Sequence, residues 1–383
     1  MRKPKFGNLN FVKTEKTLTH FKRWRQERAR RLRTKDYSFV VPNVTPDLAY
    51  LSRNATEPSV TWIGHSTFLL QYAGLNIVTD PVWSQKMAFQ NRLAPPGIAL
   101  ADMPPIDIVM VSHSHYDHLN IASLRRLTGT KLLLVPAGLK AKLRLKGFTR
   151  IQEFHWWEST TIKGVKFTFV PSQHWSRRTP WDMNRSHWGG WVIEPEQIAI
   201  DNEEAAFNAV RQARQMSQAL TEDADTAAAV IEASRAALVD ENAARRMRQA
   251  IWGDGADYDL VNQQLPVVAK LPTVYFAGDS GYFHGFKEIG ERFDIDLAVL
   301  PIGAYDPEWF MGPQHVTPEQ ALQAFIDTGA KYFLPMHYGS FKLADDTPLE
   351  ALDRLQQGRS SFQIAKERIV VLPHGETWRL SGQ

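Results

Sequence analysis

A short apolar segment that ends in a dense cluster of polar residues constrains this 383-residue chain more than any other feature. Residues 106–111 are largely apolar and β-branched, which is typical of a buried strand. The run that follows is Ser112-His113-Ser114-His115-Tyr116-Asp117-His118. In an extended chain, His113 and His115 point to the same side, and Asp117 and His118 follow where the chain can turn. Imidazole and carboxylate are ligands of zinc and related metals, so this strand end predicts a metal site.

Composition narrows the chemistry of that site. The chain has no cysteine, so any transition metal must be held by histidine and carboxylate side chains. Hydrophobic residues make up 43% of the chain, which permits a sizeable core. We find no early apolar signal region and no apolar run of about 18 residues. The expected location is therefore the cytoplasm, either free or peripheral to a membrane.

Positive charge is concentrated at the N-terminus. Residues 1–35 hold thirteen Lys and Arg against Glu15 and Glu27, a net charge of +11, whereas the whole chain carries +4. Such a segment can contact anionic lipid or nucleic acid, or it can be a solvated arm. Phe21, Trp24 and Leu32 make it amphipathic, which favours lipid. No further nucleic-acid-binding module is evident, so nucleic acid is not an expected partner.

The pattern along the chain predicts three parts. Short strands separated by glycine turns run from about residue 60 to 194 and resume at 273, with a last strand expected at 368–372. The intervening segment is rich in Ala, Glu, Asp, Arg and Gln and begins with a capping box at Asp201 and Glu204. The predicted parts are a basic arm with one helix (1–57), a catalytic domain (58–199 and 271–383) and a helical insertion (200–270).

Three further polar residues follow apolar strands. His174 comes after 167–171, Asp279 after 274–278 and His337 after 333–336. Strand ends at one edge of a packed sheet can converge on a single cleft. Together with His113, His115, Asp117 and His118, they form a set of seven candidate ligands.

The set and its flanks resemble the metallo-β-lactamase superfamily, whose signature is His-x-His-x-Asp-His. Within that superfamily the chain is similar to N-acylphosphatidylethanolamine-hydrolysing phospholipase D and its bacterial relatives. The resemblance covers about 60–199 and 271–378. It implies an α/β fold, the four-layer αββα sandwich. The segments that carry the resemblance are Trp62-Ile63-Gly64-His65-Ser66-Thr67, Thr79-Asp80-Pro81, Ser112 to Leu119, Gln173-His174-Trp175-Ser176, Trp188-Gly189-Gly190, Phe276 to Tyr282 and Met336-His337.

The resemblance also implies two zinc ions, or similar divalent metals, in each chain. One zinc is held by His113, His115 and His174. The other is held by Asp117, His118 and His337, and Asp279 bridges the two. Such a pair can lower the pKa of a bridging water to give hydroxide and can clamp a phosphoryl oxygen. Asp117, Asp279 and His315 are accordingly the predicted catalytic residues.

Three further residues are expected near the ligands. Asp80 is expected to accept the free N–H of a ligand histidine and so fix its orientation. His65 either does similar work or only packs. His315 lies where the family places a histidine near the substrate, and it either protonates the leaving group, binds phosphate or faces solvent.

The implied function is a zinc-dependent phosphodiesterase of phospholipase D type that acts on N-acylphosphatidylethanolamine-like lipids through a metal-bridging hydroxide. Hydrolysis of a lactone, a thioester or another small ester is the alternative. The insertion at 200–270 departs from the family pattern, and it is expected to serve as an excursion, a lid or an oligomer contact. The sequence therefore leaves open whether the protein forms a homo-oligomer.

Overall fold

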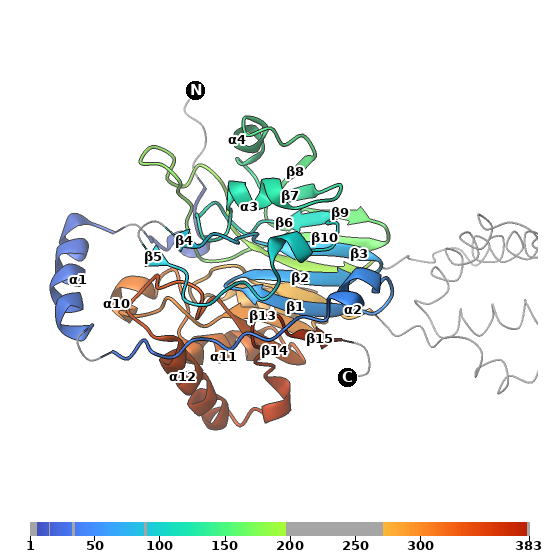
Figure 1. Cartoon of the computed structure of the whole chain (residues 1–383). Coiled ribbons are helices and arrows are strands. Elements are labelled where there is room, and N and C mark those ends of the chain that lie inside the picture. Colours follow the sequence, from blue (N-terminus) through green and yellow to red (C-terminus); the bar gives the residue numbers. More distant parts are fainter. Residues whose placement is uncertain (1–5, 15, 33–34, 88–89, 197–270, 381–383) are drawn as a thin grey trace, which may run out of the picture. The chain divides into compact units, whose positions relative to one another are not determined.

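Two β-sheets packed face to face carry most of the described chain (Figure 1). The computed structural model describes residues 6–14, 16–32, 35–87, 90–196 and 271–380. The residues up to Pro195 and from Leu271 form one compact unit. The predicted helical insertion at 200–270 lies outside the described residues. None of the helices in the described ranges is long and apolar enough to cross a bilayer.

The first sheet has seven strands and the second has six. In spatial order, the first contains β15 (Thr377–Arg379), β1 (Ser59–Gly64), β2 (Thr67–Tyr72), β3 (Leu75–Thr79), β6 (Ile108–Met110), β7 (Leu132–Pro136) and β8 (Ile151–Phe154). The second contains β14 (Tyr332–Met336), β13 (Leu297–Pro301), β12 (Val274–Phe276), β11 (Gly190–Pro195), β10 (Val165–Val170) and β9 (Ser159–Ile162). A small hairpin is formed by β4 (Lys86–Met87) and β5 (Gln90–Asn91).

Helices cover the outer faces of both sheets, with α3 and α4 on one side and α11 and α12 on the other (Figure 1). The described helices are α1 (Leu18–Arg31), α2 (Leu48–Arg53), α3 (Ile121–Arg126), α4 (Lys140–Arg144), α9 (Gly285–Arg292), α10 (Glu308–Met311), α11 (Pro318–Asp327) and α12 (Pro348–Ser361). Single 3-10 turns occur at Leu9–Phe11, Leu100–Asp102 and Lys366–Arg368. The expected sandwich of the metallo-β-lactamase type is confirmed.

Alternation along the strands explains the layers. In β7, Leu134 belongs to the core between the sheets, whereas Leu133 and Val135 belong to a second core with Leu124 of α3 and Leu143 of α4. Successive side chains point to opposite faces, so a strand that is apolar at every position must be covered on both faces. The continuous apolar runs in the sequence are therefore the reason for four layers.

Strand direction brings polar residues to one edge. Strands β12, β13 and β14 are parallel, and β10 runs the same way because both β10 and β12 are antiparallel to β11. In the first sheet, β3, β6, β7 and β8 are parallel. Residues that directly follow β10, β12 and β14 must therefore emerge at one edge of the second sheet.

One sequence prediction needs correction. The strand expected at 368–372 is wrong: Ile369 forms only an isolated bridge with Phe333, and the closing strand is β15, which pairs with β1. Helices α9 and α12 had no predicted counterpart. The helix expected around 17–33 is present as α1, which packs on α10, with the rings of Trp24 and Phe310 stacked at a centroid distance of 5.7 Å.

Substitution of Gly278 tests how closely the chain after β12 packs against Ser112, which follows β6. Gly278 has a φ of +62°, and a Cβ added there would lie 2.6 Å from Ser112 Cβ. We expect Gly278→Ala to lower the free energy of unfolding in chemical denaturation. Gly164→Ala is the matched control, because Gly164 has a φ of +71° with nothing within 4 Å and pays only the left-handed strain, about 1–2 kcal/mol. Equal losses in the two variants would contradict the close contact with Ser112.

Candidate metal centre

The structure brings together all ten residues that the sequence singles out. They come from strand ends and loops of both sheets: His65 from the β1–β2 turn, Asp80 after β3, His113, His115, Asp117 and His118 after β6, His174 after β10, Asp279 after β12 and His337 after β14. His315, from the loop between α10 and α11, joins them. Residues more than 200 positions apart in the chain thus meet at one place.

Three imidazoles form the first group of possible metal ligands, His113, His115 and His174. His115 Nδ1 lies 2.8 Å from His113 Nε2 and 3.1 Å from His174 Nε2. Two nitrogen ligands of one tetrahedral zinc lie about 3.3 Å apart, so this spacing suits one ion. The outer nitrogens of two of the rings are engaged elsewhere, because His174 Nδ1 lies 2.9 Å from the carbonyl oxygen of Gln314 and His113 Nδ1 lies 2.9 Å from Ser112 Oγ.

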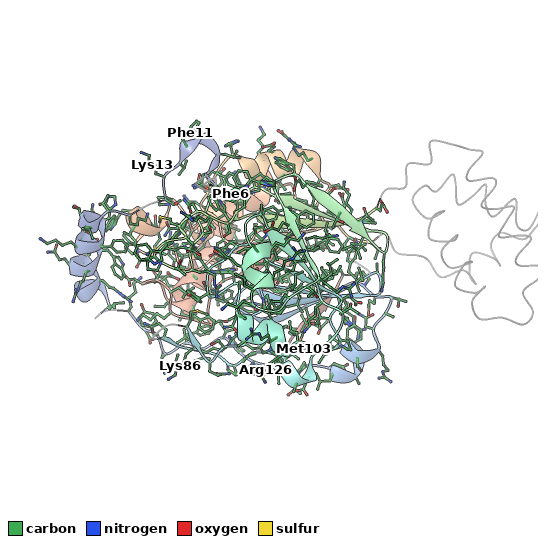
Figure 2. The ribbon with its side chains drawn as sticks, turned by 90° about the horizontal axis from the view of Figure 1, so that it is seen from above. Phe6, Phe11, Lys13, Lys86, Met103 and Arg126 are labelled. Atoms are coloured by element: carbon green, nitrogen blue, oxygen red, sulfur yellow. The ribbon has the colours of Figure 1, made fainter. Side chains whose placement is uncertain are left out.

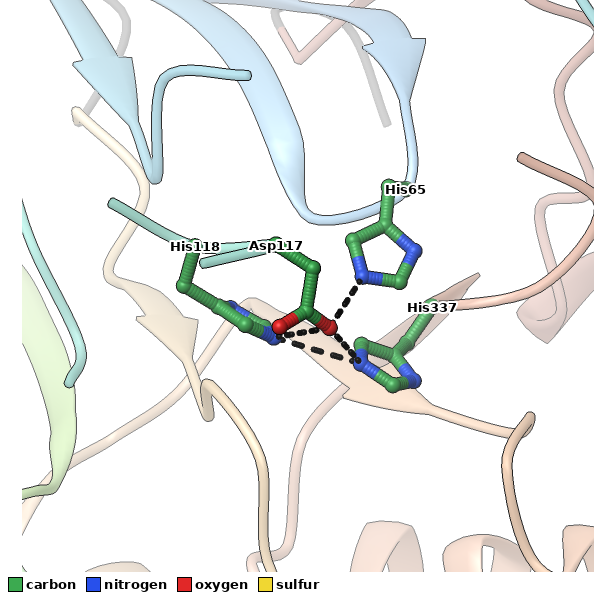
Figure 3. A group of neighbouring side chains, drawn as sticks. All are labelled: His65, Asp117, His118 and His337. Carbon is green, nitrogen blue, oxygen red and sulfur yellow. Dashed lines mark hydrogen bonds and ion pairs between the residues drawn. The ribbon is translucent and has the colours of Figure 1, made fainter. Parts of the chain in front are cut away.

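The second group contains His65, Asp117, His118 and His337 (Figure 3). Asp117 Oδ2 lies 3.1 Å from His65 Nε2, 3.4 Å from His118 Nε2 and 3.6 Å from His337 Nε2. The two nitrogens of His118 and His337 are 3.2 Å apart. This carboxylate and these imidazoles converge on one point, as ligands of a single cation do.

Asp279 lies between the two groups. Its Oδ2 is 3.2 Å from His118 Nε2, 3.8 Å from His174 Nε2 and 3.9 Å from His113 Nε2, while Oδ1 is 3.1 Å from His337 Nε2. The side chain is buried, and imidazole nitrogens of both groups surround its two oxygens. A buried carboxylate is costly unless a cation or a donor is nearby. The donors present therefore fit two cations that share this carboxylate.

Burial sets the charge state of the first group. It lowers the pKa of His115 to about 3 and that of His174 to about 4, and it holds the pKa of His113 well below its usual value. These imidazoles are therefore neutral at pH 7, which is the form that binds metals.

In the second group, burial has a smaller effect on the pKa of the His337 imidazole than the nearby carboxylates of Asp117 and Asp279 have together. Burial opposes the charged form of His337, but the carboxylates of Asp279 and Asp117 raise its pKa to about 9. Burial likewise opposes ionisation of Asp279, but His118 and His337 hold its pKa well below the usual range. The carboxylates are thus ionised, which is the form in which they can bind a cation.

Asp80 holds one ligand in place. Its Oδ2 lies 2.7 Å from His118 Nδ1 and accepts the hydroxyl of Ser112 at 2.6 Å, and its Oδ1 accepts the Ser112 backbone N–H at 2.7 Å. His118 thereby donates through Nδ1 and presents Nε2 to the site. This is the contact that was expected of Asp80.

Backbone strain gathers at the same place. His65, Asp80 and His337 have φ values of 56°, 33° and 64°, in the left-handed region that side chains rarely adopt. Each costs roughly 1–3 kcal/mol and persists only where its surroundings enforce it, most often at functional sites.

His315 is buried and faces the same space. Its Nδ1 lies 3.9 Å from Asp279 Oδ2 and has no hydrogen-bond partner among the described residues. Its ring stacks on His337 at 5.5 Å. Of the readings open for His315, the one in which it faces solvent is therefore wrong. Burial holds the pKa of His315 well below its usual value, so the ring is neutral.

Arg178, which holds the loop after β6, was not predicted from the sequence. Its Nη1 donates to the carbonyl oxygens of Ser114 and Leu119, both at 2.8 Å, and its guanidinium lies 4.2 Å from the ring centroid of Tyr116. An arginine in a polar loop has no distinguishing pattern, and its partners lie about 60 residues away.

Comparison with known proteins agrees with this geometry. A family profile described as Beta-lactamase superfamily domain matches residues 75–207 and 263–338. The chain is 28% identical over 367 residues to N-acyl-phosphatidylethanolamine-hydrolyzing phospholipase D 1 of Caenorhabditis elegans, covering 90% of this chain and 82% of that protein. It is 27% identical over 309 residues to the mitochondrial enzyme of the same name from Saccharomyces cerevisiae, covering 77% of this chain and half of the relative.

A solved structure shares the fold. Igni18, a metallo hydrolase from the archaeon Ignicoccus hospitalis, matches with a TM-score of 0.53 at 20% identity, covering 86% of this chain and all of the other.

Asp80→Asn tests the support of His118. The amide cannot accept from His118, Ser112 N–H and Ser112 O–H together, so we expect metal affinity to fall about 10–100-fold. Competition with a chelator measures it. Asp107→Asn is the control, because Asp107 accepts the backbone N–H of Asn76 outside the site. Unchanged metal affinity in Asp80→Asn would show that His118 needs no such support.

Proposed function

Because the chain belongs to the beta-lactamase superfamily, we propose that it is a binuclear zinc-dependent phosphodiesterase of phospholipase D type. The proposed substrates are N-acylphosphatidylethanolamine-like lipids. The observation that carries the proposal is the buried Asp279 carboxylate, which lies between two groups of converging ligands.

The proposed ligand assignment follows the distances. His113, His115 and His174 would hold one zinc, and Asp117, His118 and His337 the other, with Asp279 shared. When bound, two such ions activate a water at neutral pH and neutralise charge on a phosphoryl oxygen. The chain contains no cysteine and no Gly-x-Ser-x-Gly nucleophile motif.

The surrounding residues orient the ligands. Asp80 fixes His118, and the Gln314 carbonyl oxygen lies against Nδ1 of His174, so both rings present Nε2 to the centre. His65 lies 3.1 Å from Asp117 and keeps that carboxylate in position. His315, neutral and aimed at the centre, is suited to donate a hydrogen bond to a phosphoryl oxygen, which favours phosphate binding over protonation of the leaving group.

The substrate class rests on the two relatives. Their names describe hydrolysis of N-acyl-phosphatidylethanolamine, and one of them aligns with 90% of this chain. The sequence segments next to the ligands, which resemble the same enzymes, support a phosphodiester over a lactone or thioester.

A substrate panel tests the proposal. Zinc-loaded protein is offered N-acylphosphatidylethanolamine in mixed micelles, a soluble phosphodiester, a lactone and a thioester. We expect release of phosphatidic acid from the lipid. Asp279→Asn and His115→Ala should reduce turnover to background because each removes a proposed metal ligand. The readout is product formation by mass spectrometry, with bound metal counted in the same samples.

The outcomes separate the alternatives. Turnover of the lactone or thioester alone would sink the phosphodiesterase proposal while keeping the metal centre. Full activity in protein that contains no metal would sink both.

We further propose that helix α1 touches an anionic membrane surface. Lys22 and Arg25 are exposed on it, and Leu18 and Phe21 are 88% and 47% exposed beside them. Cationic and large apolar side chains on one helix are typical of interfacial binding. Other side chains of α1 attach the helix to the rest of the protein. Trp309 Nε1 donates to Glu27 at 2.8 Å, and Arg28 pairs with Asp345 at 2.8 Å.

Charge reversal on α1 tests membrane contact. We expect Lys22→Glu with Arg25→Glu to weaken co-sedimentation with phosphatidylserine-containing vesicles about tenfold or more, because each cation near an anionic surface contributes about 1 kcal/mol. The matched control is Lys86→Glu with Arg126→Glu, exposed on another part of the surface (Figure 2). If both double variants bind vesicles equally well, α1 is a solvated helix and the proposed membrane contact is wrong.

A further inference from the structure

Asn8, in the N-terminal segment before α1, contacts the backbone of a proposed metal ligand on both sides. Its Oδ1 accepts the His174 backbone N–H at 3.0 Å, and its Nδ2 donates to the His174 carbonyl oxygen at 2.9 Å. Trp188 Nε1 also donates to Oδ1, at 3.0 Å, and Nδ2 donates to the Val12 carbonyl oxygen at 3.2 Å. Two donors reach Oδ1 and two acceptors face Nδ2, so the network itself fixes which way the amide points.

His174 needs this contact because it lies outside regular structure. It follows β10 in a fully described connection to β11 that contains no helix or strand, and the one β-bridge of this connection joins Gln173 to Gly281. The amide of Asn8 takes the place of a neighbouring strand, since it pairs with both the N–H and the C=O of one residue. The ring is set from the other side by the Gln314 carbonyl oxygen.

The segment that carries Asn8 is itself anchored to this loop. The Phe6 N–H donates to the Asn184 carbonyl oxygen at 2.9 Å, and the Phe6 ring stacks on His187 at 4.5 Å. Leu9 packs against the core between the sheets. Phe11, by contrast, is 95% exposed and lies at the periphery (Figure 2). The anchored part is therefore residues 6–9.

We infer that Asn8 is a positioning residue of the metal centre, an inference that rests on the proposed metal-dependent function. It acts through His174: the Nε2 of that ring lies 3.1 Å from His115 Nδ1, so a shift of the His174 backbone moves one of three converging nitrogens. Contacts that orient metal ligands are worth about 10–100-fold in metal affinity. The N-terminal segment is thus part of the centre, although it is 166 residues away in the chain.

Asn8→Ala and Asn8→Leu test the inference in the full chain. Leucine keeps the size of the side chain but none of its hydrogen bonds. Two successive Zn²⁺ dissociation constants are measured by chelator competition, and the visible absorption of Co²⁺-loaded protein reports ligand geometry. We expect both variants to weaken one of the two constants about 10–100-fold and to alter the Co²⁺ spectrum. Asn43→Ala is the control, because Asn43 is exposed and donates one side-chain bond to the Pro95 carbonyl oxygen.

The metal-free protein distinguishes positioning from general stability. We expect Asn8→Leu and wild type to have similar unfolding temperatures when both are free of metal. The unfolding temperatures of the two metal-loaded proteins should differ far more. Wild-type constants in both Asn8 variants would overturn the inference, as would recovery in Asn8→Leu alone, which would reduce the residue to packing. If the wild type itself binds no metal, the proposed function fails instead.

Discussion

The centre depends on the hydrogen bonds that the buried Asp80 carboxylate forms with Ser112 and His118. The side chain is fully buried between β3 and β6, and burial raises its pKa even though three groups of Ser112 and His118 face it. A buried carboxylate without those groups would be strongly destabilising. The same contacts join the end of β3 to the first residues after β6. The carboxylate therefore fixes the start of the ligand loop and one ligand ring at once.

The strained backbone has the same origin. Asp80 and His337 turn into the left-handed region directly after their strands, and His65 does so in a tight turn next to a bulge in β1. Each strand is held by the sandwich on both faces, so it cannot relax by sliding. The hydrophobic layers thus offset the strain, and the polar side chains are driven to one edge where they must face each other.

Much of this could be predicted from the sequence. Apolar strands followed by His or Asp are local patterns, and parallel strands end at one edge, which is why His174, Asp279 and His337 were found with the His113–His118 cluster. The edge strand β15 was missed because it has only three residues, two half-buried and one exposed, which carry almost no apolar signal. Helix α12 was missed although Thr347 and Glu350 form a capping box at its start. Asn8 and Arg178 had no local signal, since their roles depend on partners far away in the chain.

We propose two roles for the N-terminal segment, support of the metal centre and contact with a lipid surface. Residues 6–9 contact the loop of His174, and α1 contacts α10, which leads to the loop of His315. Removing residues 1–35 would therefore disturb the proposed metal centre together with any lipid contact, and loss of activity in such a truncation could not be assigned to either. Surface charges on α1 can be changed while Asn8, Trp24 and Arg28 stay in place. A lipid surface that binds α1 would therefore act on a segment that contacts both the loop of His174 and helix α10, which precedes the loop of His315.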